Sequence, residues 1–107
     1  MKAAVLLLLT FPVAAVAFDP RYMKIGQSGE ITNFGIDLTI KEVGDDWLYI
    51  RCDSKSDPTF YFLVRGVATK GLADDKPWDY KGSWKVTDTE KYKGKTVYVL
   101  RPFDPKR

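Results

Sequence analysis

Apolar and polar residues alternate along most of the chain after residue 33, and no stretch keeps a helical period for long. Side chains two positions apart share one face of a β-strand, so this pattern predicts half-buried strands rather than helices. The expected strands are residues 34–43, 47–52, 59–65, 78–87 and 96–101. A further short strand is expected at residues 22–25 or at residues 30–31.

The patterns of two of these strands indicate where they lie in the fold. The strand 59–65 is apolar on both faces, which is typical of a central or covered strand. In the last strand, Val97 and Val99 are expected to face the core and Tyr98 to face outward. The polar stretch 88–95 before it is expected to be a solvated hairpin loop.

Residues 1–17 have the layout of a secretory signal peptide. Lys2 precedes an apolar run that closes on Ala15-Val16-Ala17. The run is shorter than the roughly 20 apolar residues needed to cross a bilayer. We expect cleavage after Ala17, with cleavage after Ala15 as the alternative, and a secreted or periplasmic protein. The mature chain, residues 18–107, is then a single small domain without a membrane span.

Cys52 is the only cysteine, so no disulfide can form within the chain. Exported domains of this size often use disulfides, and this one must rely on its apolar core instead. Cys52 follows Leu48 and Ile50 at a spacing of two, so we expect a buried and inert thiol. Pairing with a second chain through Cys52 is the alternative.

A set of five or six short strands cannot bury a core as a flat sheet. Closing the sheet removes its edges and creates one interior. We therefore expect an all-β fold, namely a small antiparallel barrel of five to six strands that is OB-like or SH3-like. A small β-sandwich is the alternative architecture.

Three segments of the chain carry a recognisable pattern. They contain Gly66-Val67-Ala68-Thr69-Lys70-Gly71-Leu72, then Trp84-Lys85-Val86-Thr87, then Thr96-Val97-Tyr98-Val99-Leu100-Arg101-Pro102-Phe103. Over residues 26–105 the chain resembles small exported β-barrel segments of uncharacterised planctomycete-type bacterial proteins. Trp84 stands where that pattern has phenylalanine. The resemblance implies a small barrel and export, and it implies no functional residues.

The chain has no histidine. It therefore lacks the commonest general base, the commonest metal ligand and any histidine-dependent catalytic triad. The paired carboxylates Asp45-Asp46 and Asp74-Asp75 lie at expected turns, where aspartate bonds its own backbone. A weak calcium site is the alternative for these pairs. We expect no enzymatic activity, no metal and no cofactor.

Aromatic and basic side chains collect on the strand faces opposite the expected core. This candidate binding surface consists of Trp47, Tyr49, Arg51, Tyr61, Arg65, Tyr98 and Arg101. Aromatic and basic mixtures bind single-stranded nucleic acid, and sugars and peptides also dock on aromatic faces. Outward aromatics that stabilise cross-strand pairs are the simpler interpretation. Trp78, on a loop, joins the candidate surface or plugs one end of the barrel.

The charge balance and the expected export narrow the choice of partner. The mature chain has 16 basic and 14 acidic side chains, a net charge of +2, which is not a polyanion-binding composition. We expect a monomeric binding module for an envelope protein, a peptide or a glycan, with no nucleic-acid partner. A structural component of an envelope assembly, linked through Cys52, is the alternative.

Overall fold

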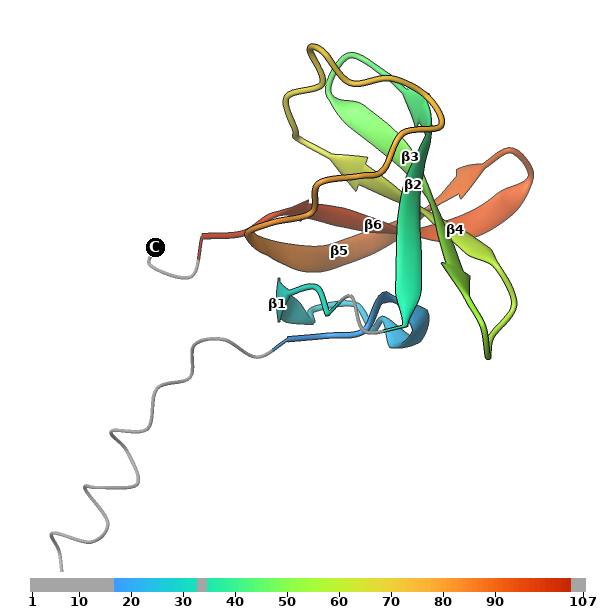
Figure 1. Cartoon of the computed structure of the whole chain (residues 1–107). Helices are drawn as coiled ribbons and strands as arrows, with labels where there is room; N and C mark the ends of the chain where they lie inside the picture. The colour runs from blue at the N-terminus through green and yellow to red at the C-terminus, as the bar shows by residue number, and fades with distance from the viewer. Residues whose placement is uncertain (1–16, 33–34, 105–107) are drawn as a thin grey trace, which may run out of the picture.

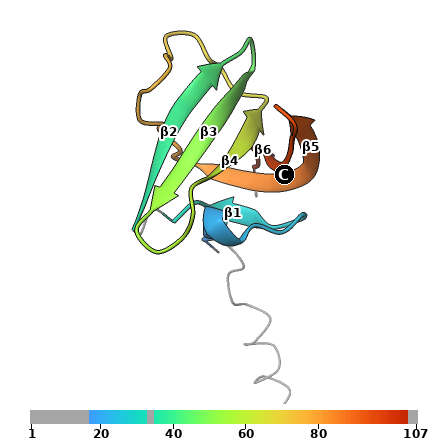
Figure 2. The ribbon, with the colours of Figure 1, turned by 90° about the vertical axis from the view of Figure 1, so that its right-hand side faces the viewer.

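The computed structural model describes residues 17–32 and 35–104, which form one curled sheet of six strands (Figure 1). The strands are β1 (Ser28–Glu30), β2 (Ile36–Val43), β3 (Trp47–Ser54), β4 (Phe60–Arg65), β5 (Ser83–Tyr92) and β6 (Lys95–Pro102), and a 3₁₀ turn, η1 (Pro20–Tyr22), precedes them. Their order across the sheet is β1-β5-β6-β4-β3-β2. The sheet bends into a half-barrel (Figure 2), so the expected small barrel-like all-β fold is confirmed.

One strand pair departs from the expected antiparallel arrangement. β4 and β6 run parallel, with Leu63 opposite Val99 and Val64 opposite Leu100, whereas the other four pairs are antiparallel. A parallel pair needs a long crossover between its strands. The chain supplies this crossover because it leaves β4, passes along the edge of β2 and returns through β5 before it enters β6.

The fourth long strand lies five residues later than its expected range of 78–87. Gly82 has a φ of 100°, and β5 begins directly after it at Ser83.

The expected loop at residues 88–95 is wrong, because β5 and β6 continue to a tight turn at Lys93-Gly94. Both turn residues have positive φ, 53° and 79°, as a two-residue hairpin requires. The short strand lies at Ser28–Glu30 and shares Glu30 with the second of the two expected positions.

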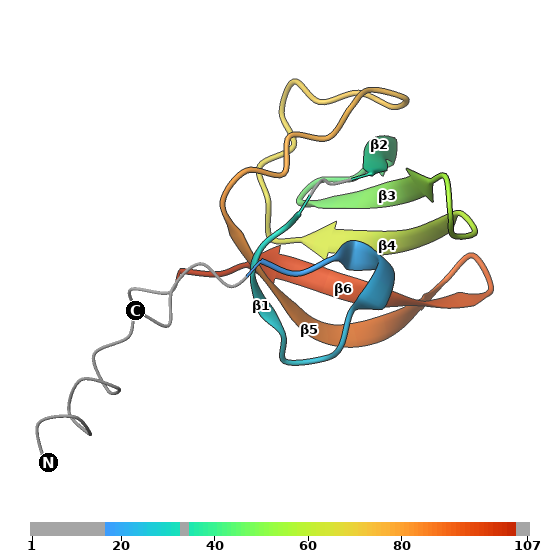
Figure 3. The same ribbon diagram turned by 60° about the horizontal axis from the view of Figure 1, so that its bottom comes forward.

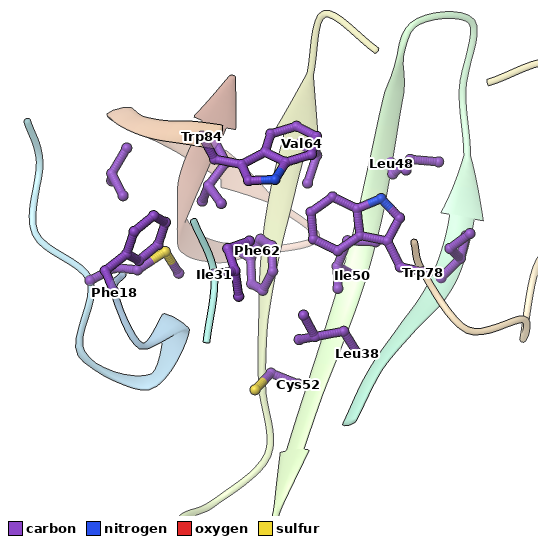
Figure 4. Close-up of a cluster of buried hydrophobic side chains, with 14 residues drawn as sticks. Phe18, Ile31, Leu38, Leu48, Ile50, Cys52, Phe62, Val64, Trp78 and Trp84 are labelled. Atoms are coloured by element: carbon purple, nitrogen blue, oxygen red, sulfur yellow. The ribbon is translucent and has the colours of Figure 1, made fainter. Parts of the chain in front are cut away.

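The inner face of the sheet encloses the main core, which contains Leu48, Ile50 and the buried Cys52 as expected (Figure 4). Trp78 is only 6% exposed and enters this core from the crossover. Its ring centroid lies 6.0 Å from that of Phe62 and 5.1 Å from that of Trp84. Trp78 therefore plugs the half-barrel, and its place on the candidate binding surface is wrong.

The crossover also protects the edge of β2. The backbone N–H of Asp75 donates to the Ile40 carbonyl (2.6 Å), and the Ile40 N–H donates to Lys76 (2.8 Å). The N–H of Trp78 donates to the Leu38 carbonyl (3.0 Å). A covered edge cannot pair with another chain along these residues. Asp74 and Asp75 lie in a turn, as expected, and the Asp75 carboxylate accepts from Lys41 Nζ (2.6 Å).

The N-terminal segment closes the lower end of the half-barrel (Figure 3). Phe18 is 2% exposed, its N–H donates to the Glu30 carbonyl (2.9 Å), and its own carbonyl accepts from Thr32 (3.0 Å). Most of the expected leader lies outside the described residues, and Ala17 is exposed. Within the described part of the chain, no helix is long and apolar enough to cross a membrane.

Candidate binding surface

The outer face of the sheet carries a second apolar cluster. Its buried members are Tyr49, Leu63, Val97 and Val99, and its half-buried members are Trp47, Tyr61 and Tyr92. The cluster forms because the end of the β5–β6 hairpin packs against the outer side of β3 and β4. We call this side of the sheet the outer face.

The expected orientation of β6 is wrong. Val97 and Val99 lie on the outer face, while Tyr98 packs against the main core beside the buried Leu100. β6 is apolar on both faces, so alternation alone cannot decide which side is inward. The parallel pairing decides it, because Val99 lies opposite the outer-face residue Leu63. Tyr98 is therefore not part of the outer face, where the sequence pattern had placed it.

The aromatic rings of the outer face pack on one another. Tyr49 stacks on Tyr61 with a centroid distance of 5.1 Å and an interplanar angle of 13°. Tyr92 lies 4.7 Å from Tyr49 and meets Trp47 edge-on at 5.7 Å. Tyr49 is 6% exposed and cannot contact a ligand directly, so it acts as a support. Part of Trp47 and part of Tyr61 stay accessible.

A polar group holds the tip of the hairpin over these rings. Glu42 on β2 accepts a hydrogen bond from the Tyr92 hydroxyl and forms an ion pair with Lys93. The Lys93 ammonium, and then the Tyr92 hydroxyl, hold the pKa of Glu42 below its ordinary value. Burial, reinforced by Glu42, raises the pKa of Tyr92 to about 12. Tyr92 therefore stays neutral and keeps donating at physiological pH.

Lysines lie against the rings on the same side. Lys93 Nζ is 6.0 Å from the Tyr49 centroid and 5.9 Å from that of Tyr92, and Lys95 Nζ is 5.6 Å from the Tyr61 centroid. These distances are within the range of cation–π attraction. Lys95 forms no ion pair with any described carboxylate. It is therefore the cation beside Tyr61 that remains available.

Two of the three candidate arginines are engaged within the protein. Arg65 donates from Nε and Nη2 to the two oxygens of Glu90 (2.8 and 2.7 Å), and Arg51 Nε donates to Asp53 (2.8 Å). The hydrogen bonds from Arg65 lower the pKa of Glu90, and Glu90 in turn raises that of Arg65. Arg101 is exposed on the outer face of β6.

The outer face therefore unites six of the eight predicted site residues, namely Trp47, Tyr49, Arg51, Tyr61, Arg65 and Arg101. Sequence reasoning missed four contributors to this surface, namely Glu42, Tyr92, Lys93 and Lys95. The signal that was available is Gly94, since glycine readily adopts the positive φ of a tight hairpin turn, and a turn at this point places Tyr92 and Lys95 on strands.

A second region, near η1, is a shallow cleft. Its volume is about 590 Å³, and its lining includes Arg21, Asp37 and Lys55. Arg21 is tied to Asp19 (2.6 Å) and to Asp57 (3.4 Å), so its charge is already balanced. Among the described residues, no three Cys, Asp or Glu side chains gather as a metal site requires. The described side chains that line this cleft therefore do not form a candidate site.

Comparisons with known proteins add no identification. No protein-family model matches the chain, and neither the curated proteins nor the solved structures give a match.

Proposed function

We propose that this protein is an exported binding module whose ligand contacts the outer face of the sheet. The observation that supports the proposal is the half-buried state of Trp47 and Tyr61, which rest on Tyr49 and Tyr92. Beside them lies Lys95, which pairs with no carboxylate of the described residues. Aromatic side chains that are already held in place lose little conformational entropy when a ligand binds. An envelope protein, a peptide or a glycan can use such a surface.

The state of the acidic side chains favours binding over catalysis. An acid–base pair requires carboxylates that converge and have their pKa values shifted apart. Here Glu42, Asp53, Asp75 and Glu90 each accept from a neighbouring cation, and each has a lowered pKa. They stay charged and engaged at neutral pH, so they stabilise the fold.

The burial of Cys52 argues against the alternative of a disulfide-linked assembly. The Cys52 side chain is 1% exposed, and burial raises the pKa of its thiol to about 11. Disulfide exchange requires an accessible thiolate. A link through Cys52 therefore requires the fold to open.

The proposal can be tested with the mature chain, residues 18–107, on a glycan array and in pull-downs from an envelope or extracellular fraction. The variants are Tyr61→Ala and Lys95→Gln, which alter the accessible part of the outer face. Tyr22→Ala is the control, since Tyr22 is 62% exposed and is the last residue of η1, outside the outer-face cluster. Thermal unfolding of each variant verifies that it is folded.

We expect at least one ligand whose binding weakens by about tenfold in Tyr61→Ala or Lys95→Gln, the equivalent of one lost contact of roughly 1.4 kcal/mol. Tyr22→Ala is expected to bind as the unchanged protein does. A ligand that binds equally to all the folded variants, or the absence of any ligand, contradicts the proposal.

A further inference from the structure

The positive charge of the mature chain is concentrated in one element, the β5–β6 hairpin. Residues 83–102 contain five basic and two acidic side chains, whereas the other 70 residues of the mature chain contain 11 basic and 12 acidic. One of the two hairpin carboxylates, Glu90, is bound to Arg65. The mature chain is therefore nearly neutral overall, but its β5–β6 hairpin is basic and lies next to the aromatic rings.

Two of the hairpin cations oppose each other directly. Lys85 on β5 and Arg101 on β6 are partners in the antiparallel register, and both are exposed. Like charges in opposite positions of neighbouring strands repel each other. Neither has an ion-pair partner among the described carboxylates. An anion placed between them would replace this repulsion with two attractions.

The cations and the accessible aromatics lie on one continuous surface. Leu100 on β6 lies opposite Val64 on β4, so Arg101 and Arg65, the next residues along these two parallel strands, are neighbours. Arg65 in turn lies opposite Trp47 on β3. At the other end of β6, Lys95 sits over Tyr61. The outer face thus offers rings for apolar contact and separated cations for charged groups along the same strand.

We propose that the ligand of the outer face is an anionic polysaccharide. Its sugar rings contact Trp47 and Tyr61, and its carboxylate or sulfate groups pair with Lys95 and with the Lys85–Arg101 pair. This inference rests on the proposed binding function and names the chemical class of the ligand.

The charge balance favours a sugar chain over a nucleic acid, and the exposed side chains argue against a membrane. Single-stranded nucleic acid is bound along a positively charged groove that follows the phosphates of successive nucleotides. The mature chain has a net charge of only +2, and two basic side chains of the outer face, Arg51 and Arg65, are already paired with carboxylates. A membrane surface needs protruding apolar side chains. The large apolar side chains that the described residues expose are Tyr22, Ile25 and Leu72, outside the outer-face cluster.

The test compares polygalacturonate with neutral dextran of similar length, by calorimetric titration of the mature protein at about 0.02 M and 0.5 M salt. Lys85→Gln/Arg101→Gln removes the opposed cations. Lys70→Gln/Lys81→Gln is the matched control, because both lysines are exposed outside the hairpin and the net charge changes equally. Tyr61→Ala tests the aromatic contact.

We expect polygalacturonate to bind and dextran not to bind at the lower salt concentration. The Lys85/Arg101 double variant is expected to bind about tenfold or more weakly, and the Lys70/Lys81 double variant within about twofold of the unchanged protein. Affinity is expected to fall at the higher salt concentration and in Tyr61→Ala.

Four results overturn the inference. Equal losses in the two double variants would mean that only net charge matters. Dextran binding that is weakened by Tyr61→Ala but not by the Lys85/Arg101 double variant would show that the outer face binds a neutral sugar. The proposed binding function would then stand, and the anionic ligand would be excluded. Binding of single-stranded DNA or of anionic phospholipid vesicles without polygalacturonate would identify another class of partner. Absence of binding to every probe, together with an empty screen on the glycan array and in the pull-downs, would remove the proposed function as well.

Discussion

At the scale of single residues, Trp47 and Gly44 depend on each other. A Cβ atom added at Gly44 would lie 2.0 Å from the Trp47 indole ring, so the ring needs the empty space that glycine leaves. Trp47 also meets Tyr92 edge-on, which connects the β2–β3 turn to the tip of the hairpin. The position of one of the accessible rings of the outer face thus depends on a residue that has no side chain.

Gly44→Ala is expected to destabilise the protein by about 1–3 kcal/mol, since the Trp47 ring must move away from Tyr92. Urea unfolding measures the change. In a Trp47→Ala background the same substitution is expected to cost much less, because the clash is gone. Equal costs in both backgrounds would contradict this account of the turn.

The ionised carboxylates predict how stability depends on pH. Each of five described carboxylates has its pKa lowered, mainly by a basic neighbour or, for Asp53, by the Thr59 hydroxyl. They are Asp19, Glu42, Asp53, Asp75 and Glu90. A folded-state pKa below the unfolded value stabilises the fold above the unfolded pKa, and this contribution disappears as the pH falls through the folded pKa.

Stability is therefore expected to be constant near neutral pH and to fall from about pH 4.5 downward, given unfolded pKa values of roughly 4. The urea midpoint, measured across this range, tests the prediction. In Glu42→Gln/Glu90→Gln the fall is expected to be smaller, because two of the contributing groups no longer titrate. A midpoint that is equally high in acid would show that these pairs add nothing to stability.

At the scale of elements, the crossover from β4 to β5 has two structural tasks. Its backbone covers the edge of β2 through Asp75 and Trp78, and the Trp78 side chain fills the half-barrel. Trp78→Ala is expected to cost about 3–5 kcal/mol in unfolding free energy. Leu72→Ala, in the same crossover but 40% exposed, is expected to cost less than about 1 kcal/mol. Similar costs for the two would mean that Trp78 is not a core residue.

The elements also show how far alternation predicts this fold. It located β2, β3, β4 and β6 to within two residues, because these strands contribute many apolar side chains to a core. It placed β5 five residues too early, because the second half of this strand is polar where the hairpin extends beyond the main core. It also failed for the faces of β6, since both faces are buried, and the pairing with β4 is a long-range contact that local pattern does not encode.

At the scale of the whole molecule, one small sheet has apolar clusters on both faces and no disulfide. This arrangement explains how so small a domain can bury enough apolar surface without disulfides. The N-terminal segment completes the main core, since Phe18 and Met23 are buried in it. The half-barrel is thus completed by the N-terminal segment and by Trp78 of the crossover, which both enter the main core.

The buried thiol provides a test of this closed state. Because Cys52 is 1% exposed and its pKa is raised to about 11, we expect almost no reaction with Ellman's reagent near pH 8. Addition of denaturant is expected to release one equivalent at the unfolding transition. Rapid reaction of the folded protein, or a dimer on a non-reducing gel, would reopen the possibility of a Cys52-linked assembly.

The most direct test of the central claim, that the outer face is the binding surface, is to map the contact by NMR. Backbone amide shifts of the mature chain are recorded while polygalacturonate oligomers are added. We predict that the perturbed amides cluster around Trp47, Tyr61, Lys95 and Arg101, on β3, β4 and β6. Perturbations centred instead on the cleft that Arg21 and Lys55 line, or no perturbation at all, would contradict the claim.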